Sequence, residues 1–187
     1  MIIKEKGLLR MMKEAYKRSG YTVAAFEADG DTYLFIHNPG WCVSMELGNV
    51  PRKVLGLIAE HIGKLPKIEE GYRVSKEAVQ QEIFAVAAAP GMEMMEEASV
   101  LLSHEPVRRT RITWDGCDAW QNTVTMEIAL VKPDVAGIAL FNKEQDIRSV
   151  NAHLIVKGKA SVAMIANLPI PESEQRFVTH LAGMQWI

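Results

Sequence analysis

The sequence predicts an α+β protein in which antiparallel β-meanders carry helices packed on one face. Residues 21–47 give the first observation: three β-prone runs are separated there by an Asp-Gly pair at 29–30 and an Asn-Pro-Gly turn at 38–40. Helical patterns stand on both sides of this meander. Residues 107–187 are again β-rich and end in a helical pattern. We therefore expect two related halves, each containing a ββα arrangement.

Residues 1–66 are expected to form an α-β-β-β-α unit. Apolar residues recur every three or four positions over 3–18, which indicates an amphipathic helix that ends at Ser19-Gly20. In the third strand, alternation places four apolar side chains on one face, those of Trp41, Val43, Met45 and Leu47. The following helix, between Asn49 and Pro66, has an apolar stripe made of Val54, Leu55, Ile58, Ile62 and Leu65. The stripe is expected to bury Trp41, Val43 and Met45.

Residues 67–106 are expected to form a helical connecting region. The stretch 75–90 is interpreted as a helix begun by Ser75, although a strand through 82–87 is the alternative. A second short helix is expected over 92–103, and its methionines Met92, Met94 and Met95 are interpreted as core residues rather than as an adaptable binding surface. Residues 107–187 then form a β-rich unit with a C-terminal helix, either separate from the first unit or joined to it in one compact domain.

The two halves align when the chain is shifted by 119 residues. Val43 then matches Val162, Met45 matches Met164, and His61 matches His180. We expect the two histidines to hold equivalent places on two helices that cover related meanders, and neither to perform acid-base chemistry. The identities are few, because hairpin-plus-helix units readily converge on such patterns.

Composition excludes several functional classes. The 187 residues are 48% hydrophobic and 24% charged, with a formal net charge of -2, so a sizeable core is expected and a general attraction to nucleic acid or anionic lipid is not. The opening residues lack the apolar core of a signal peptide, and the longest apolar run, 83–92, has about half the ~20 residues that a membrane-spanning helix needs. A cytoplasmic protein without membrane contact is expected.

No catalytic, cofactor or metal site is predicted. Cys42 and Cys117 have no zinc-ligand spacing, and nucleotide-binding loops and nucleophile-elbow motifs are absent from the sequence. Carboxylates beside Cys117 would raise its thiol pKa, which disfavours a nucleophile. Glu60 and His61 are adjacent on a helix and point about a quarter-turn apart, so they do not form a dyad. A packing role is the favoured interpretation of His61.

Basic and aromatic residues near position 110 resemble the mixture found in single-strand nucleic-acid platforms. They are Arg108, Arg109, Arg111, Trp114 and Trp120. A charged edge strand that resists aggregation is the favoured interpretation. Together with His61 and His180, four of these residues, Arg109, Arg111, Trp114 and Trp120, are the candidate ligand or partner residues.

The stretch PRKVLGLIAEHIGKLP at 51–66, with an opening helix ending in Ser-Gly-Tyr and a third strand bearing Trp41, is similar to uncharacterised proteins of Gram-positive bacteria, some associated with prophages or mobile elements. The resemblance covers about the first 85 residues and implies no known activity. The helix-meander-helix layout also resembles that of bacterial secretion chaperones, which bind partner proteins as dimers.

A non-enzymatic protein that binds a protein partner or a second copy of itself is therefore the leading functional hypothesis. The alternative is an enzyme or small-ligand binder with a cleft between the halves, using scattered residues such as His61, His180, Glu46 and Asp118.

Overall fold

The computed structural model describes residues 2–83, 106–139, 146–150, 153–168 and 170–184. Its helices are α1 (Glu5–Lys17), the 3-10 turn η1 (Leu47–Asn49), α2 (Arg52–Ile62), α4 (Pro133–Ala136) and α5 (Glu172–Met184). The first five strands are β1 (Tyr21–Ala28), β2 (Asp31–Asn38), β3 (Trp41–Glu46), β4 (Glu70–Val74) and β5 (Val79–Ile83). The others are β6 (Val107–Trp114), β7 (Cys117–Asn122), β8 (Ile128–Val131), β9 (Asp146–Val150), β10 (His153–Gly158) and β11 (Ser161–Ala166). The α+β class is confirmed.

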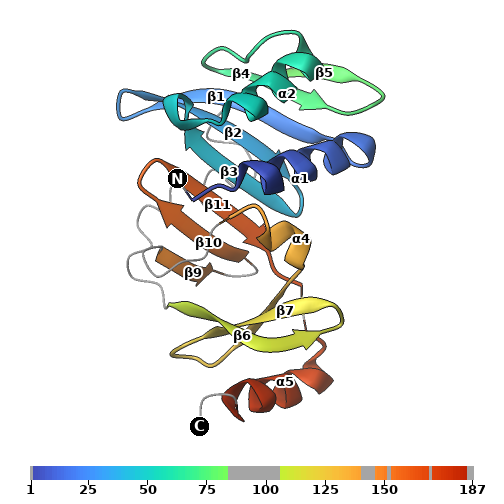
Figure 1. Cartoon of the computed structure of the whole chain (residues 1–187), viewed down its shortest axis with the longest axis vertical. Coiled ribbons are helices and arrows are strands. Elements are labelled where there is room, and N and C mark those ends of the chain that lie inside the picture. The colour runs from blue at the N-terminus through green and yellow to red at the C-terminus, as the bar shows by residue number, and fades with distance from the viewer. Residues whose placement is uncertain (1, 84–105, 140–145, 151–152, 169, 185–187) are drawn as a thin grey trace.

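Eight strands form one antiparallel sheet in the order β5-β4-β1-β2-β3-β11-β10-β9. The first meander, β1-β2-β3, and the second, β9-β10-β11, meet edge to edge because β3 pairs antiparallel with β11 (Figure 1). Outward from this junction, one side runs β3-β2-β1 and the other runs β11-β10-β9, and β4 and β5 extend the first side. The two meanders are therefore joined as one continuous sheet.

The first meander has the geometry that its turn residues predict. Asp29 and Gly30 have φ values of 53° and 84°, and Ala28 pairs with Asp31 across them. A two-residue hairpin turn with positive φ at both positions matches the twist of the flanking strands. Gly20, with φ of 74°, lies where α1 ends and β1 begins. Local turn chemistry thus sets the register of the first half.

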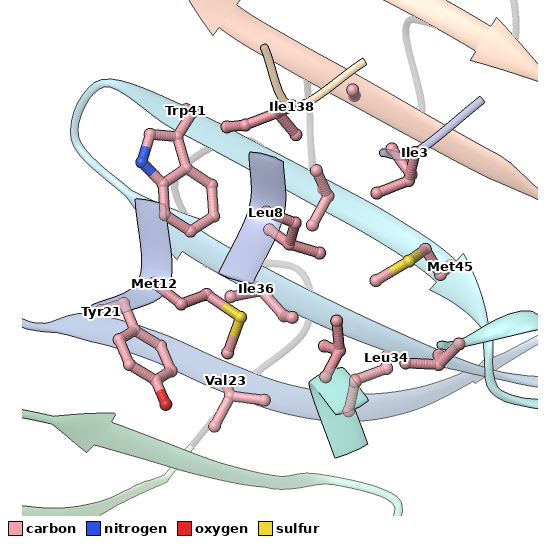
Figure 2. Close-up of a cluster of buried hydrophobic side chains, with 14 of the residues drawn as sticks. Ile3, Leu8, Met12, Tyr21, Val23, Leu34, Ile36, Trp41, Met45 and Ile138 are labelled. Carbon is pink, nitrogen blue, oxygen red and sulfur yellow. The ribbon is translucent and has the colours of Figure 1, made fainter. Parts of the chain in front are cut away.

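The predicted core of the first half is confirmed. Trp41, Val43 and Met45 are buried in one cluster with Ile58 of α2. Figure 2 shows that Leu8 and Met12 of α1 reach the same face of the sheet, so α1 and α2 cover it together. The cluster also receives Ile138, which follows α4.

Two ends of the predicted elements differ from expectation. Leu47 lies in η1 and is exposed instead of continuing the apolar face of β3. Helix α2 ends at Ile62 because Gly63 adopts the left-handed conformation with φ of 84°, so Leu65 lies beyond the helix and is exposed. Glycine therefore ends this helix before Pro66 is reached.

The helix predicted from Ser75 is wrong where the structure describes it. Strand β5 runs from Val79 to Ile83, and Val74 pairs with Val79 across a tight turn. The Ser75 hydroxyl accepts hydrogen bonds from the backbone N–H groups of Glu77 and Ala78. Serine here stabilises a turn, a role that competes with helix capping. Residues 84–105, including Met92, Met94 and Met95, lie outside the described residues.

The 119-residue alignment of the halves is wrong by one position in the strands. Asn38 pairs with Trp41 beside the first turn and Gly158 pairs with Ser161 beside the second, so equivalent residues are 120 positions apart. At the junction Val43 pairs with Ala163, its equivalent at that spacing. A one-residue shift turns every side chain to the opposite face of a sheet. The matches of Val43 with Val162 and of Met45 with Met164 therefore join opposite faces.

The second half covers its meander with a small sheet rather than with a helix. The three-stranded sheet β6-β7-β8 packs on β10 and β11 through a cluster that holds Trp120, Val131, Leu154 and Ile165. Its other face carries Cys117, Ala119, Ile128 and Leu130, which pack against Val178 of α5. Helix α5 thus lies on the small sheet, at the end of the molecule farthest from α2 in Figure 1. The expectation that α5 covers its own meander is wrong.

Candidate functional site

His61 is a packing residue at the end of α2. Its ring stacks on Tyr16 with the centroids 4.0 Å apart and the planes at 16°. The Tyr21 hydroxyl lies 2.8 Å from Nδ1 of His61. Burial raises the pKa of Tyr21, so the hydroxyl keeps its proton, and the tautomer of His61 decides which of the two groups donates the hydrogen bond. The imidazole therefore links α1, β1 and α2, and Glu60 is solvent-exposed.

Stability is expected to fall in acid through His61. Burial lowers the pKa of the folded ring below its ordinary value of 6.5, Glu60 raises it and Lys13 lowers it, with a net decrease. Between the two pKa values, His61 is protonated in the unfolded chain and neutral in the folded protein. The contribution of His61 to the free energy of unfolding is therefore present above about pH 6.5 and is lost as the pH falls through the folded pKa. Denaturant unfolding between about pH 8 and pH 5 measures it.

The matching variant is His61→Gln, which should show a weaker pH dependence than the parent protein. Part of the dependence will remain, because burial also lowers the pKa values of His37 and His153. An identical pH dependence in both proteins would show that His61 does not contribute.

His180 has a different environment from His61. It is exposed on α5 and lines a shallow groove between this helix and the β7–β8 turn. The two histidines lie on helices at opposite ends of the molecule, and the prediction that they hold equivalent places is wrong (Figure 1). Asp118 is paired with Arg109, and Glu46 lies near the junction of the meanders. The structure therefore does not assemble His61, His180, Glu46 and Asp118 into one cleft.

The basic and aromatic residues of β6 and β7 are also separated. Arg109 binds Asp118 at 2.7 Å, and Arg108 donates to the Gln121 side chain at 3.2 Å. Arg111 is exposed, whereas Trp120 is buried between the two sheets and cannot stack on a base. Strand β6 is an outer strand in the order β6-β7-β8 and has an irregularity between Arg109 and Thr113. Charged side chains and an irregularity on an outer strand hinder its pairing with the edge of another sheet.

Trp114 belongs to the other face of the small sheet. Its indole N–H donates to Glu174 of α5 at 2.9 Å, and its ring meets Phe177 edge-to-face at 5.7 Å. Phe177 is nevertheless 53% exposed, although the helical spacing of Phe177, Leu181 and Met184 would allow all three to face inward. Val178, the next residue, is the one that packs on the sheet. Phe177 thus becomes a surface residue supported by Trp114.

The two cysteines lie in the interior of the protein. Both are buried as free thiols, and burial raises the pKa of Cys42 to about 12. Among the described residues, no group of three or more His, Cys, Asp or Glu side chains could hold a metal ion.

Three hollows lined by residues that the structure describes are candidate sites. The groove beside α5, of about 460 Å³, is lined by Thr125, Met126, Glu127, Gln175, Arg176, Thr179 and His180. A hollow of about 530 Å³ near the β3–β11 junction is lined by Ile2, Asp31, Tyr33, Glu46, Asn49, Lys159, Ala160 and Ser161. A third, of about 430 Å³, lies between the end of α1 and the β4–β5 turn.

Of these three hollows, the one at the junction most resembles the cleft between the halves that an enzyme or small-ligand binder would need. It contains Glu46 but not His61, His180 or Asp118. The Glu46 carboxylate accepts a hydrogen bond from Asn49 at 2.9 Å. This hollow therefore offers carboxylates without a neighbouring imidazole.

Comparisons with known proteins give one structural neighbour and no family. No protein-family model matches the chain, and a search of curated proteins gives no significant match. A crystal structure of a DNA polymerase III subunit beta sliding clamp from Bartonella birtlesii is similar with a TM-score of 0.31 and 12% identity, covering 94% of this chain and 67% of the clamp chain. None of the described helices has the length and apolar character needed to cross a membrane. The resemblance to Gram-positive and prophage proteins stays a prediction.

Proposed function

We propose that the protein acts by binding another protein at the outer surface of α5, and that it is not an enzyme. The observation that carries this proposal is the exposure of large apolar side chains at this end of the molecule. Val124 is 63% exposed at the β7–β8 turn, and Phe177 is 53% exposed on α5. Exposed aromatic side chains are enriched at interaction sites, where such anchors often dominate the binding energy.

The groove beside α5 fits a polypeptide segment better than a metabolite. Metabolite sites enclose most of their ligand, whereas this groove is shallow and lies between a helix and a turn. Met126 offers an apolar contact, and Arg176 has no ion-pair partner among the described residues. The expected partner segment carries an apolar side chain for Met126 and a carboxylate for Arg176.

The surface is held rigidly by the contacts beneath it. Trp114 is fixed to Glu174 by a hydrogen bond, and Val178 anchors α5 to the small sheet. A preorganised surface loses less conformational entropy when it binds. The cytoplasmic location and the bacterial or phage origin indicated by the sequence are part of this proposal.

Substitution of Phe177 tests the proposal. The parent protein, Phe177→Asp and the control Leu65→Asp are immobilised in equal amounts, because Leu65 is also exposed but lies beyond α2 in the first half. A partner captured from the host lysate is then purified and its Kd measured. We expect Phe177→Asp to weaken binding by at least about tenfold, a loss typical of an aromatic anchor, and Leu65→Asp to leave it unchanged.

Two outcomes would contradict this assignment. Equal binding by Phe177→Asp would place the interface elsewhere. Sedimentation that shows a dimer of the parent protein and a monomer of Phe177→Asp would make the occupant a second copy of the chain.

A further inference from the structure

The geometry points to a second binding site, for a compact anion that carries several phosphate groups, in the hollow between the end of α1 and the β4–β5 turn. One wall consists of Tyr16, Lys17, Arg18 and Ser19. The other consists of Arg73, Ser75, Lys76, Glu77, Ala78 and Gln80. Four cationic side chains and one carboxylate therefore line the same hollow.

Charge concentrates here against the balance of the whole chain. Lys17, Arg18, Arg73 and Lys76 with Glu77 give the lining a formal charge of +3. The whole chain has -2, so the remainder carries -5. A concave site of one sign focuses its field and raises the local concentration of an oppositely charged ligand.

The four cations are available to a ligand. Within the described part of the chain, ion pairs involve Arg10, Lys53, Lys64 and Arg109, and none of the four lining cations takes part in one. Glu77 lines the hollow and yet forms no ion pair with its basic neighbours. The simplest other explanation, surface cations neutralised by nearby carboxylates, therefore does not apply.

The helix end itself does not account for the cluster. Cations are favoured near a helix C-terminus because its free carbonyl groups carry partial negative charge. Here the Ala15 carbonyl accepts from the N–H groups of Arg18 and Gly20, and the Tyr16 carbonyl accepts from the N–H of Lys76. These bonds occupy two of the terminal carbonyls. Arg73 and Lys76 also belong to a different element, β4 and the turn after it.

The same backbone bond makes the hollow a fixed structure. The Lys76 N–H donates to the Tyr16 carbonyl at 2.8 Å and so ties one wall to the other. Ser75 closes the turn through a bond from its N–H to the Ala78 carbonyl at 2.9 Å. Gly20 has φ of 74°, and a Cβ atom there would stand 2.9 Å from the Val74 carbonyl oxygen, so the two segments approach closely. The backbone segments that carry the four cations are thus fixed before a ligand arrives.

Size and charge select the class of ligand. A volume of about 430 Å³ is in the range of small-molecule sites and exceeds the space that one phosphate ion fills. Arg and Lys are the usual partners of phosphate oxygens. A long nucleic acid would extend beyond the hollow, and the formal net charge of -2 gives the chain as a whole no general attraction to a polyanion. A compact polyphosphate, free or as part of a nucleotide, is therefore favoured over RNA or DNA.

Calorimetric titration of the full chain with tripolyphosphate tests the site, with ATP, orthophosphate and a single-stranded RNA as further probes at constant ionic strength. The test variant is Arg73→Gln with Lys76→Gln. The matched control is Arg52→Gln with Lys67→Gln, which removes the same charge from exposed positions outside the hollow. We expect one tripolyphosphate per chain, at least a tenfold weaker affinity in the test variant, and a change of less than twofold in the control.

Three outcomes overturn the assignment. No binding of tripolyphosphate at millimolar concentration would show that the hollow is an unoccupied surface feature. An equal loss in both double variants would assign binding to overall charge. Tighter binding of RNA than of tripolyphosphate, lost in the test variant, would make the site a nucleic-acid contact. ATP binding tighter than that of tripolyphosphate supports the site and identifies a nucleotide as its ligand.

Discussion

Replacing Ile58 by alanine is expected to lower the free energy of unfolding by about 2 to 5 kcal/mol. Ile58 is completely buried in the cluster that joins α2 to β3 and α1. The substitution removes apolar contacts and leaves a cavity that the surrounding side chains fill only in part. Denaturant unfolding monitored by tryptophan fluorescence measures the loss, since Trp41 lies in the same cluster.

A graded series separates packing from a general effect of substitution. Ile58→Val should cost about 0.5 to 1.5 kcal/mol because it removes a single methylene. Glu60→Ala, on the exposed side of the same helix, should change stability by no more than about 0.5 kcal/mol. Equal midpoints for Ile58→Ala and Glu60→Ala would contradict the packing of α2 on β3.

The first half could be predicted because its signals are local. Asp29 and Gly30 specify their own turn, and the alternation of β3 and the stripe of α2 each require an apolar partner. The end of α2 was predicted too late, at Pro66, because a second stop signal, Gly63, stands three residues earlier and its left-handed conformation ends the helix first. Ser75 was ambiguous in the same way, since serine stabilises turns as well as helix starts.

The register between the halves could not be read from residue identity. Both faces of β3 and β11 are largely buried, including Cys42 beside Val43 and Met164 beside Ala163. Alternation fixes a register only where one face is polar. The shift of 119 residues therefore matched similar side chains that point in opposite directions, whereas the paired strands give 120.

The candidate sites depend on contacts between distant segments. Lys17 and Arg18 meet Arg73 and Lys76 only because β1 pairs with β4 and the β4–β5 turn returns to α1. The helical pattern of 171–184 likewise does not specify which sheet it covers. Trp120 fills the space between the small sheet and β10–β11, so α5 packs on the outside and leaves Phe177 exposed. No local sequence pattern specifies which segments meet at the hollow or which sheet α5 covers.

Two glycine-to-alanine substitutions in helices are expected to have opposite effects. At Gly56, in the middle of α2, an added Cβ would meet nothing within 4 Å. Alanine there should raise the free energy of unfolding by up to about 1 kcal/mol, because glycine loses more backbone entropy in a helix. At Gly7, in the first turn of α1, a Cβ would stand 2.7 Å from the carbonyl carbon of Gly137 and closer still to its oxygen.

Gly7→Ala is therefore expected to lower stability by about 1 to 3 kcal/mol, the usual cost of overpacking, despite its better helix propensity. The backbone contact is difficult to relieve, because both sides of it are tied down. Lys4 N–H donates to the Ile138 carbonyl at 2.7 Å, and Arg10 binds the Asp134 carboxylate at 3.0 Å. Moving α1 away would break these bonds and lift Leu8 from the core. Unfolding midpoints of the Gly56→Ala and Gly7→Ala variants test this difference. If both substitutions stabilise the protein, α1 does not approach the segment after α4 as closely as this packing requires.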